Sequence, residues 1–300
     1  MNRAMDDTAG LPRHACSFLF VPASRPERLA KALASGADMV IADWEDAVAP
    51  ADKGAARAAL ALAVGALEAA DRPRVLVRIN AEGTPWHAED LAALGPLAAQ
   101  GIAGVVVPKA ERAPTLHAAA RAAGPGAALL PLVESVAGLD ALDALAAAPQ
   151  VARLVFGHLD FQADAGIDCG EGEAELLPMR MALVLASRRA GLAAPVDGVT
   201  VDTRDAARLA ADADRSRRMG FGGKLCIHPA QVPALHGVFD PEPAAVEHAQ
   251  RVRQALHEAG GGVCVVDGRM ADAPVLKRAE QVLARHARAQ ARGQRTAPAR

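Results

Sequence analysis

Short apolar runs alternate along the chain with longer stretches that are rich in Ala, Leu, Arg and Glu. Eight of the runs have the length and the turn-bounded ends of buried strands. They cover residues 17–22, 39–45, 74–80, 104–109, 128–134, 153–160, 194–200 and 223–229. The stretches between them have a helical pattern, and several begin at Asp, Ser or Thr and end at Gly, as helices do. Examples are residues 26–36, 52–70, 177–191 and 203–220.

This alternation predicts an α/β fold with a parallel sheet. Eight repeats over ~250 residues are typical of a (β/α)8 TIM barrel. An open doubly wound sheet is the alternative, but the glycine-rich phosphate turn that would follow its first strand is missing from residues 21–28, VPASRPER.

The pattern continues beyond the eighth run. Residues 242–260 and 273–290 predict two extra C-terminal helices, and residues 261–274 between them predict a hairpin or a lid segment. We therefore expect an N-terminal tail over 1–16, a catalytic barrel over 17–240, C-terminal helices with the lid over 241–287, and a frayed tail over 288–300.

Composition narrows the function classes. The net charge of −2 gives no indication of nucleic acid or of a membrane surface as a partner. The four cysteines are far apart in the sequence, so neither a disulfide framework nor a zinc site is expected, and a reducing cytoplasm fits. The N-terminus lacks the apolar segment of a signal peptide, and no apolar run reaches the ~18 residues of a membrane span.

Ionisable residues gather where the predicted strands end. Active sites of the TIM barrel lie at the carboxyl ends of its strands. The candidates there are Arg25, Asp43, Glu45, Asp46, Arg78, Asn80, Lys109, Glu134, Asp160 and His228. Glu134 and Asp160 each end an apolar run, and such a carboxylate pair predicts a Mg²⁺ site with room for water and substrate. The alternative is that both are solvated loop acids.

Arg78 lies among apolar residues in VLVRIN, so its charge needs a partner. It could pair internally with Asp43 or Glu45, or hold a substrate carboxylate or carbonyl by a bidentate fork. Lys109 could instead be a Schiff-base lysine. His228 precedes Pro229, and its role could be a structural hydrogen bond or proton transfer.

Eight segments together resemble the citrate lyase beta subunit-like branch of the HpcH/HpaI aldolase/citrate lyase superfamily, with malyl-CoA and citramalyl-CoA lyases nearest in pattern. They are FLFVPASRPERLAKA, DWEDAVAPADKGAAR, VRIN, VPKAE, VESVAGL, FGHLDF, GFGGKLCIHPAQV and DGRMADAPVLKRAE, in this order over about residues 17 to 283. Several motifs in fixed order are more specific than a lone short motif.

The resemblance implies a Mg²⁺-dependent carbon–carbon lyase that cleaves or forms a 3-hydroxyacyl-CoA thioester, such as malyl-CoA, citramalyl-CoA or citryl-CoA. The products would be an acyl-CoA and a 2-oxo acid. It also implies a cytoplasmic homo-oligomer, a trimer or a hexamer, that needs neither nucleic acid nor a membrane.

The same resemblance implies roles for single residues. Glu134 and Asp160 would bind the metal, and Arg78 would hold the oxo acid and polarise its carbonyl. The substrate site would also include Phe20, Arg25, Lys31, Leu159, Ile227 and His228, with Arg25 and Lys31 near the CoA phosphates. Asp272 would be a catalytic acid that reaches a neighbouring subunit, although it could simply cap the last helix.

Two departures from the family pattern concern the expected pocket wall. Trp44 replaces the usual aliphatic residue of D-L-E-D, and Asp164-Ala165-Gly166 replaces the common D-L-G. Two other functions remain open: a metal-dependent aldolase acting on free hydroxy-oxo acids, and a non-catalytic subunit of a citrate lyase-type assembly. The aldolase branch carries a catalytic His near the end of its first strand, where this chain has Arg25 and no His.

Overall fold

The structure, a computed structural model, describes residues 10–260 and 262–296. Eight parallel strands close into a barrel in chain order, from β1 through β8 and back to β1. They are β1 Ser17–Pro22, β2 Met39–Asp43, β3 Val75–Arg78, β4 Gly104–Val107, β5 Ala128–Val133, β6 Val155–Phe156, β7 Val196–Asp197 and β8 Gly223–Cys226. Each lies inside one of the eight expected runs, so the predicted (β/α)8 barrel is confirmed.

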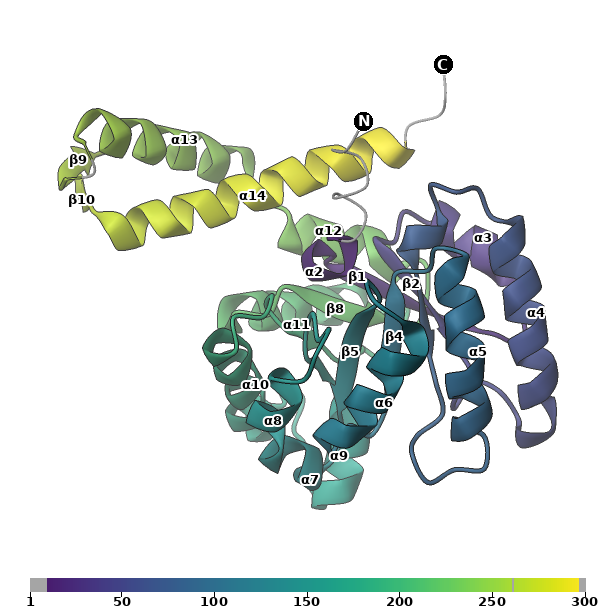
Figure 1. Cartoon of the computed structure of the whole chain (residues 1–300). Helices are drawn as coiled ribbons and strands as arrows, with labels where there is room; N and C mark the ends of the chain where they lie inside the picture. Colours follow the sequence, from purple (N-terminus) through teal and green to yellow (C-terminus); the bar gives the residue numbers. More distant parts are fainter. Residues whose placement is uncertain (1–9, 261, 297–300) are drawn as a thin grey trace. The chain divides into compact units, whose positions relative to one another are not determined.

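Helices follow the strands and lie on the outside of the barrel (Figure 1). They are α3 Glu27–Ala34, α4 Lys53–Ala66, α5 His87–Ala99, α6 Ala113–Ala123, α7 Val136–Asp140, α8 Leu142–Ala146, α9 His158–Ala165, α10 Leu177–Arg189 and α11 Ala206–Met219. The short helix α2 Leu11–His14 precedes β1. Helix α11 shows how the residues at its two ends set where a helix begins and ends. The Asp205 side chain accepts a hydrogen bond from the Arg208 N–H at its start, and Gly220 ends it in the left-handed conformation.

The barrel interior is a packed apolar core. It includes Phe18, Ile41, Leu76, Leu132 and Leu225, all at most 5% exposed. Successive residues of a strand point to opposite sides of the sheet, so these positions fix which later residues also point inward. The next inward position on each strand lies two residues further on, at the carboxyl ends of the strands.

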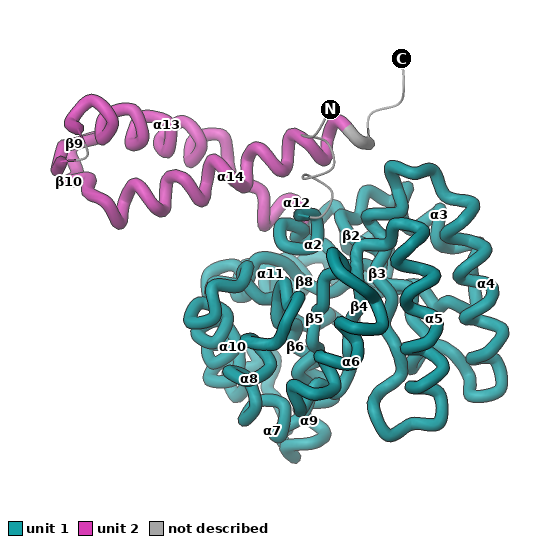
Figure 2. Tube along the Cα trace, viewed as in Figure 1, with its two compact units in different colours: residues 1–235 teal, residues 236–300 magenta. Residues whose placement is uncertain are grey.

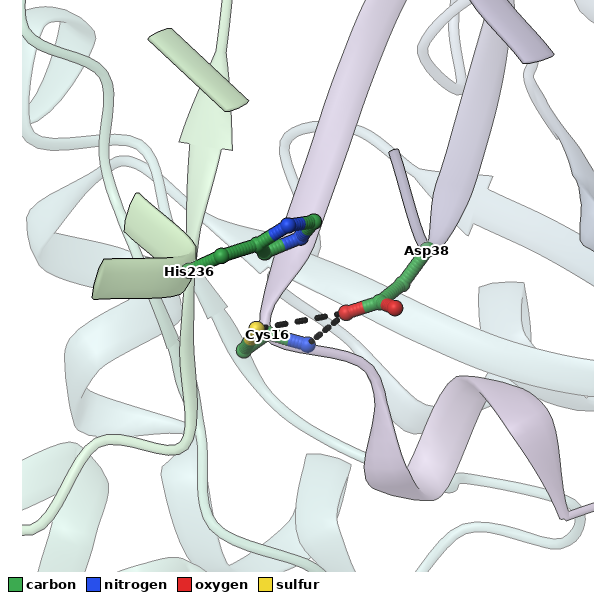
Figure 3. Close-up of side chains that lie close together, drawn as sticks. All are labelled: Cys16, Asp38 and His236. Atoms are coloured by element: carbon green, nitrogen blue, oxygen red, sulfur yellow. Dashed lines mark hydrogen bonds between the residues drawn. The ribbon is translucent and has the colours of Figure 1, made fainter. Parts of the chain in front are cut away.

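The amino ends of β1 and β2 are tied together by polar contacts. Asp38 accepts hydrogen bonds from the backbone N–H of Cys16, at 2.8 Å, and from its thiol, at 3.2 Å (Figure 3). The Ser17 hydroxyl accepts a bond from the Asp38 N–H at 2.8 Å. These contacts lie at the end of the strands away from the predicted site, where they serve stability.

The chain divides into two compact units, residues 1–235 and 236–300 (Figure 2). Helix α12, Gln231–Phe239, contains the boundary. The second unit has helices α13 Pro243–Glu258 and α14 Ala273–Thr296, joined by an antiparallel hairpin of β9 Cys264–Val266 and β10 Arg269–Ala271. Its own apolar core includes Ala249, Val252, Leu256 and Ala279.

The expected domain boundaries stay predictions. The helix over 11–14 falls within the expected N-terminal tail, whose residues 1–9 lie outside the described residues. Helix α14 continues past position 288, where a frayed tail was expected. No described helix is both long and apolar enough to cross a membrane.

Candidate active site

The inward positions that follow the barrel core carry the chemistry of the site. Asp43 lies two residues after the core residue Ile41, and Arg78 lies two residues after Leu76. By the same step, β5 leads to Glu134 and β8 leads to Ile227. A cavity of about 360 Å³ opens at this level. Its lining includes Phe20, Asp43, Asp46, Arg78, Glu134, Leu159, Asp160 and Ile227.

Arg78 is held by an internal fork. Its Nε and one terminal nitrogen donate to the two carboxylate oxygens of Asp43, at 2.7 and 2.6 Å. Its other terminal nitrogen lies 3.1 Å from carboxylate oxygens of both Glu45 and Asp46. The Phe20 ring lies against the guanidinium, 4.9 Å from it. The internal pairing expected as one alternative is therefore present, and it fixes the plane of a guanidinium that also lines the cavity.

The residues 43–47, which we call the acidic turn, concentrate negative charge beside Arg78. The Asp43 carboxylate accepts hydrogen bonds from the N–H groups of Glu45 and Ala47, at 2.9 and 3.1 Å. Burial raises the pKa of Glu45 to about 8, against the lowering effect of Arg78, and the nearby carboxylates Asp46, Glu134 and Asp43 raise it further. The turn thus places three carboxyl groups beside one guanidinium.

Glu134 is buried at the end of β5 and faces the cavity. Its Oε1 accepts the backbone N–H of Lys109 at 2.7 Å, and Lys109 adopts a left-handed conformation with φ of 44°. Burial raises the pKa of Glu134 to about 7, the Lys109 N–H opposes this, and Asp160 adds to it by repulsion. A Cβ on Gly157 would lie 2.6 Å from both Cβ and Oε2 of Glu134, so the glycine leaves the space that this carboxylate occupies.

The donor set fits Mg²⁺. Glu134 and Asp160 line one cavity, and the Asp160 carboxylate helps to raise the pKa of Glu134. A divalent cation between two carboxylates would remove that repulsion, and carboxylate oxygens are the ligands that Mg²⁺ prefers. Gly157 adds no side chain of its own next to Oε2 of Glu134.

Residues 16–229 match the family model of the HpcH/HpaI aldolase/citrate lyase family. The chain belongs to this family. The family is described as aldolases and citrate lyases, so the expected lyase class is confirmed, and the resemblance seen in the motifs is confirmed as well.

Named relatives lie within this lyase family. A (3S)-malyl-CoA thioesterase of Cereibacter sphaeroides is 36% identical over 275 residues, which cover 90% of this chain and 93% of that protein. An L-malyl-CoA/beta-methylmalyl-CoA lyase of the same species is 33% identical over 295 residues, covering 88% and 92%.

Solved structures agree in fold and hold informative ligands. CitE from Mycobacterium tuberculosis, in complex with magnesium, acetoacetate and coenzyme A, has a TM-score of 0.76 and 35% identity, covering 92% of this chain and 99% of that one. A citrate lyase beta subunit from the same organism, complexed with oxaloacetate and magnesium, has a TM-score of 0.67 and 35% identity, covering 77% and 100%. The magnesium in both agrees with the expected Mg²⁺ cofactor.

The structure brings together only some of the site residues expected for a family member. Phe20, Arg78, Glu134, Leu159, Asp160 and Ile227 line the cavity. Arg25 and Lys31 are exposed and are not among the described lining residues. His228 is also outside the lining, and its Nδ1 accepts the Ala230 N–H at 3.1 Å in the turn before α12.

Asp272 lies in the second unit, immediately before α14. Its Oδ1 accepts the Val275 N–H at 3.3 Å, and its backbone carbonyl accepts the Leu276 N–H at 2.9 Å. The capping role considered as an alternative is therefore present, and the catalytic role stays a prediction.

The expectation that Trp44 forms part of the pocket wall is wrong. Trp44 is fully buried and is not among the lining residues. It directly follows the inward-facing Asp43, so alternation turns its side chain away from the barrel axis. Asp164 also has another use, because its carboxylate accepts the Val136 N–H at 2.8 Å and ties α9 to the start of α7.

A buried charged network beside the site was not predicted. Glu173 pairs with Arg180 at 2.5 Å and Arg215 at 2.9 Å, and it lies 3.5 Å from His158. Burial alone would raise the pKa of Glu173, but the bond from His158 and the charge of Arg180 hold it well below its ordinary value. The acidic composition of residues 168–175 is the signal that could have indicated it, although the partners come from distant helices.

Proposed function

We propose that this protein is a Mg²⁺-dependent carbon–carbon lyase acting on a 3-hydroxyacyl-CoA thioester. It would cleave, or in reverse form, a substrate of the malyl-CoA, citramalyl-CoA or citryl-CoA type, with an acyl-CoA and a 2-oxo acid as the other side of the reaction. The observation that carries the proposal is that one cavity is lined by the carboxylates of Glu134 and Asp160 and by the guanidinium of Arg78.

The chemistry follows from where charge moves. Cleavage breaks the bond between the carbon next to the thioester carbonyl and the carbinol carbon. The electron pair stays on the thioester side as an enolate, while the hydroxyl loses its proton and becomes the carbonyl of the 2-oxo acid. A Mg²⁺ ion held by Glu134 and Asp160 would supply Lewis acidity toward the oxygens of the oxo acid.

The protein's own residues orient the substrate and neutralise the negative charge of the oxo acid. Arg78, fixed by Asp43, presents positive charge where the oxo acid carries negative charge. Phe20 lies against the guanidinium, at 4.9 Å, and restricts its motion. Asp272 would move the proton between the enolate carbon and solvent, for which a well-placed carboxyl group is suited.

The CoA part would lie outside the cavity. Leu159 and Ile227 are 45% and 42% exposed at the cavity rim and offer apolar contact to an extended thioester arm. Arg25, Lys31 and His228 would contribute charge or polar contacts farther out. The solved CitE contains magnesium, acetoacetate and coenzyme A, which supports a site for a metal, a small oxo acid and CoA.

A second candidate function is hydrolysis of the same thioester. It is favoured by one observation, the 36% identity to a (3S)-malyl-CoA thioesterase. The two functions share the Mg²⁺ site but differ in products, because hydrolysis releases free CoA and an intact hydroxy acid.

The test is a product analysis. We would incubate the protein with malyl-, citramalyl-, β-methylmalyl- and citryl-CoA, with and without Mg²⁺, and measure acyl-CoA, 2-oxo acid and free CoA. We expect acyl-CoA and 2-oxo acid in equal amounts, only with Mg²⁺. Release of free CoA without a 2-oxo acid would establish hydrolysis instead.

Variants show whether the proposed ligands serve this reaction. Glu134→Gln and Asp160→Asn should each abolish cleavage. The matched control is Asp143→Asn, which removes a carboxylate that is 72% exposed and pairs with Arg189 on the outer surface. Retained cleavage in either cavity variant would remove that residue from the site.

A further inference from the structure

A buried lysine lies directly behind the acidic turn. Lys53 is the first residue of α4 and is only 4% exposed. Its ammonium donates to the backbone carbonyls of Trp44, at 2.8 Å, and Glu45, at 2.9 Å, and lies 4.8 Å from the centre of the Trp86 ring. A buried charge is costly unless it is compensated, and here two carbonyls of one turn provide the compensation.

The salt bridges of the described residues include none to Lys53. Its charge is therefore directed at the backbone of residues 44 and 45 and at an aromatic face. An ammonium has three donors and no acceptor, so it can hold two successive carbonyls in a fixed relation. The Trp44 carbonyl also accepts from the Asn80 side chain, at 3.2 Å.

The turn that Lys53 holds determines the surroundings of Arg78. Glu45 and Asp46 each place a carboxylate oxygen 3.1 Å from the same terminal nitrogen of Arg78. The Trp44 N–H donates to the Arg78 carbonyl at 3.0 Å, so the turn is also bonded to the end of β3. Movement of the turn would therefore move the guanidinium relative to the cavity.

Repulsion between the carboxylates of the acidic turn would favour such a movement if Lys53 were absent. Asp43 and Asp46, joined by Glu45 when it is ionised, lie around one guanidinium, and like charges at this spacing repel one another. The Lys53 ammonium lies behind the turn and supplies positive charge close to the backbone that carries these carboxylates. It opposes the opening of the turn without occupying the cavity, whose described lining does not include it.

We infer that Lys53 is a positioning residue for the oxo-acid half of the substrate. It acts through the acidic turn on Arg78 and does not touch substrate. This inference rests on the proposed function, in which Arg78 binds the oxo acid.

The experiment compares Lys53→Met with the control variant Arg74→Met. Arg74→Met removes another buried cation that donates to two backbone carbonyls, those of Leu33 and Ala37, at 2.8 and 2.7 Å. Arg74 precedes β3 and lies at the end of the barrel away from the cavity, so its loss affects stability without touching the acidic turn.

Binding is measured by calorimetry with Mg²⁺ alone and with pyruvate or glyoxylate in saturating Mg²⁺. In Lys53→Met we expect oxo-acid affinity to fall by about 10- to 100-fold, because small misplacements of a binding group have effects of this size. Affinity for Mg²⁺ alone should stay within about twofold, because Glu134 follows β5 and Asp160 lies in α9, and neither belongs to the acidic turn. Lys53→Arg, which keeps a donor, should recover part of the oxo-acid affinity.

Equal losses of oxo-acid affinity in Lys53→Met and Arg74→Met would overturn the inference, because they would indicate general destabilisation. If Lys53→Met does not fold, Lys53→Gln decides, because it removes the charge and keeps a side-chain N–H donor. A folded Lys53→Gln with wild-type oxo-acid affinity and unmoved Arg78 contacts would leave Lys53 no positioning role.

A crystal structure separates this inference from the proposed function. In Lys53→Met the contacts of 3.1 Å from Arg78 to Glu45 and Asp46 should be lost, whereas in Arg74→Met they should remain. Wild-type protein that binds no oxo acid would count against the proposed function, and the crystallographic comparison would still test Lys53. Unchanged Arg78 contacts in Lys53→Met would refute the positioning role.

Discussion

Adding one methyl group at Gly157 should damage the metal site. Gly157 has φ of −92° and ψ of 70°, so the backbone does not demand glycine by a positive φ. The added Cβ would instead meet Cβ and Oε2 of Glu134 at 2.6 Å. Ordinary carbon–carbon contacts are about 3.5–4.0 Å, so the Glu134 side chain must shift by about 1 Å.

Two magnitudes follow for Gly157→Ala. Affinity for Mg²⁺ should fall by about 10- to 100-fold, as it does when the surroundings of metal ligands are changed. The free energy of unfolding should fall by about 1–3 kcal/mol from overpacking, because the Leu132 side chain also lies 3.3 Å from the new atom.

Calorimetric titration with MgCl₂, with and without pyruvate, measures the first effect, and urea unfolding measures the second. Gly172→Ala is the matched control, since a Cβ there meets nothing within 4 Å. The reasoning would be refuted if folded Gly157→Ala bound Mg²⁺ within about twofold of wild type, since Glu134 would then not be a ligand held in this geometry.

Three further predictions concern charge. Arg78→Lys should lower kcat/KM for cleavage by about 100-fold although the charge remains, because lysine cannot make the fork to Asp43 and still reach the cavity; steady-state kinetics near wild type would show that charge alone suffices. Glu173→Gln should cost about 1–3 kcal/mol at pH 7, because Arg180 and Arg215 each lose one of two carboxylate partners and keep only Asp197 and Asp212, respectively. The folded-state pKa of Glu173 is depressed, so the stabilisation that its carboxylate provides is present above the unfolded pKa of about 4.3 and is lost as pH falls below it. Urea unfolding at several pH values should show that the difference in the free energy of unfolding between wild type and Glu173→Gln becomes smaller in acid. A difference that does not depend on pH would contradict this. Asp272→Asn and Glu134→Ala, each inactive alone, should partly restore cleavage when dissociated and reassembled together if Asp272 acts on a neighbouring subunit, and no activity in verified mixed oligomers would confine Asp272 to its own chain or to its cap.

The barrel was predictable because its signals are local and repeated. Each of the eight apolar runs contains a strand, and the stretches between them contain the helices. The apolar runs also identified Arg78, Glu134 and Asp160, which line one cavity, although Asp160 lies in the first turn of α9 and not in β6. Parallel strands bring their carboxyl ends to one mouth, so a residue's place at a strand end already limits its location.

The side of the sheet to which a side chain points, and its distance from the strand, decide which of these residues reach the cavity. Arg25 lies in the turn before α3 and Lys31 lies within α3, so neither belongs to the lining. His228 directly follows the cavity residue Ile227 and is also outside the lining. Trp44 was misplaced for a simpler reason. It neighbours Asp43, and neighbours in an extended chain point to opposite sides.

Counting in steps of two from the core residues would have given a sharper prediction. Ile41, Leu76 and Leu132 are inward-facing core positions, and the next inward positions are Asp43, Arg78 and Glu134. The same rule does not reveal why Gly157 is needed. Its neighbour comes from the adjacent strand, where β5 and β6 pair Val133 with Phe156.

The sequence could not assign a role to residues that act on a segment other than their own. Lys53 begins a helix, yet its ammonium acts on the turn after β2. Gly198 follows β7, yet a Cβ there would lie 2.0 Å from the His158 ring, which follows β6. In both cases the constraint is a close approach between segments that only the closed barrel brings together. Catalytic groups can be found from the ends of strands, whereas the residues that fix their positions need the register between strands.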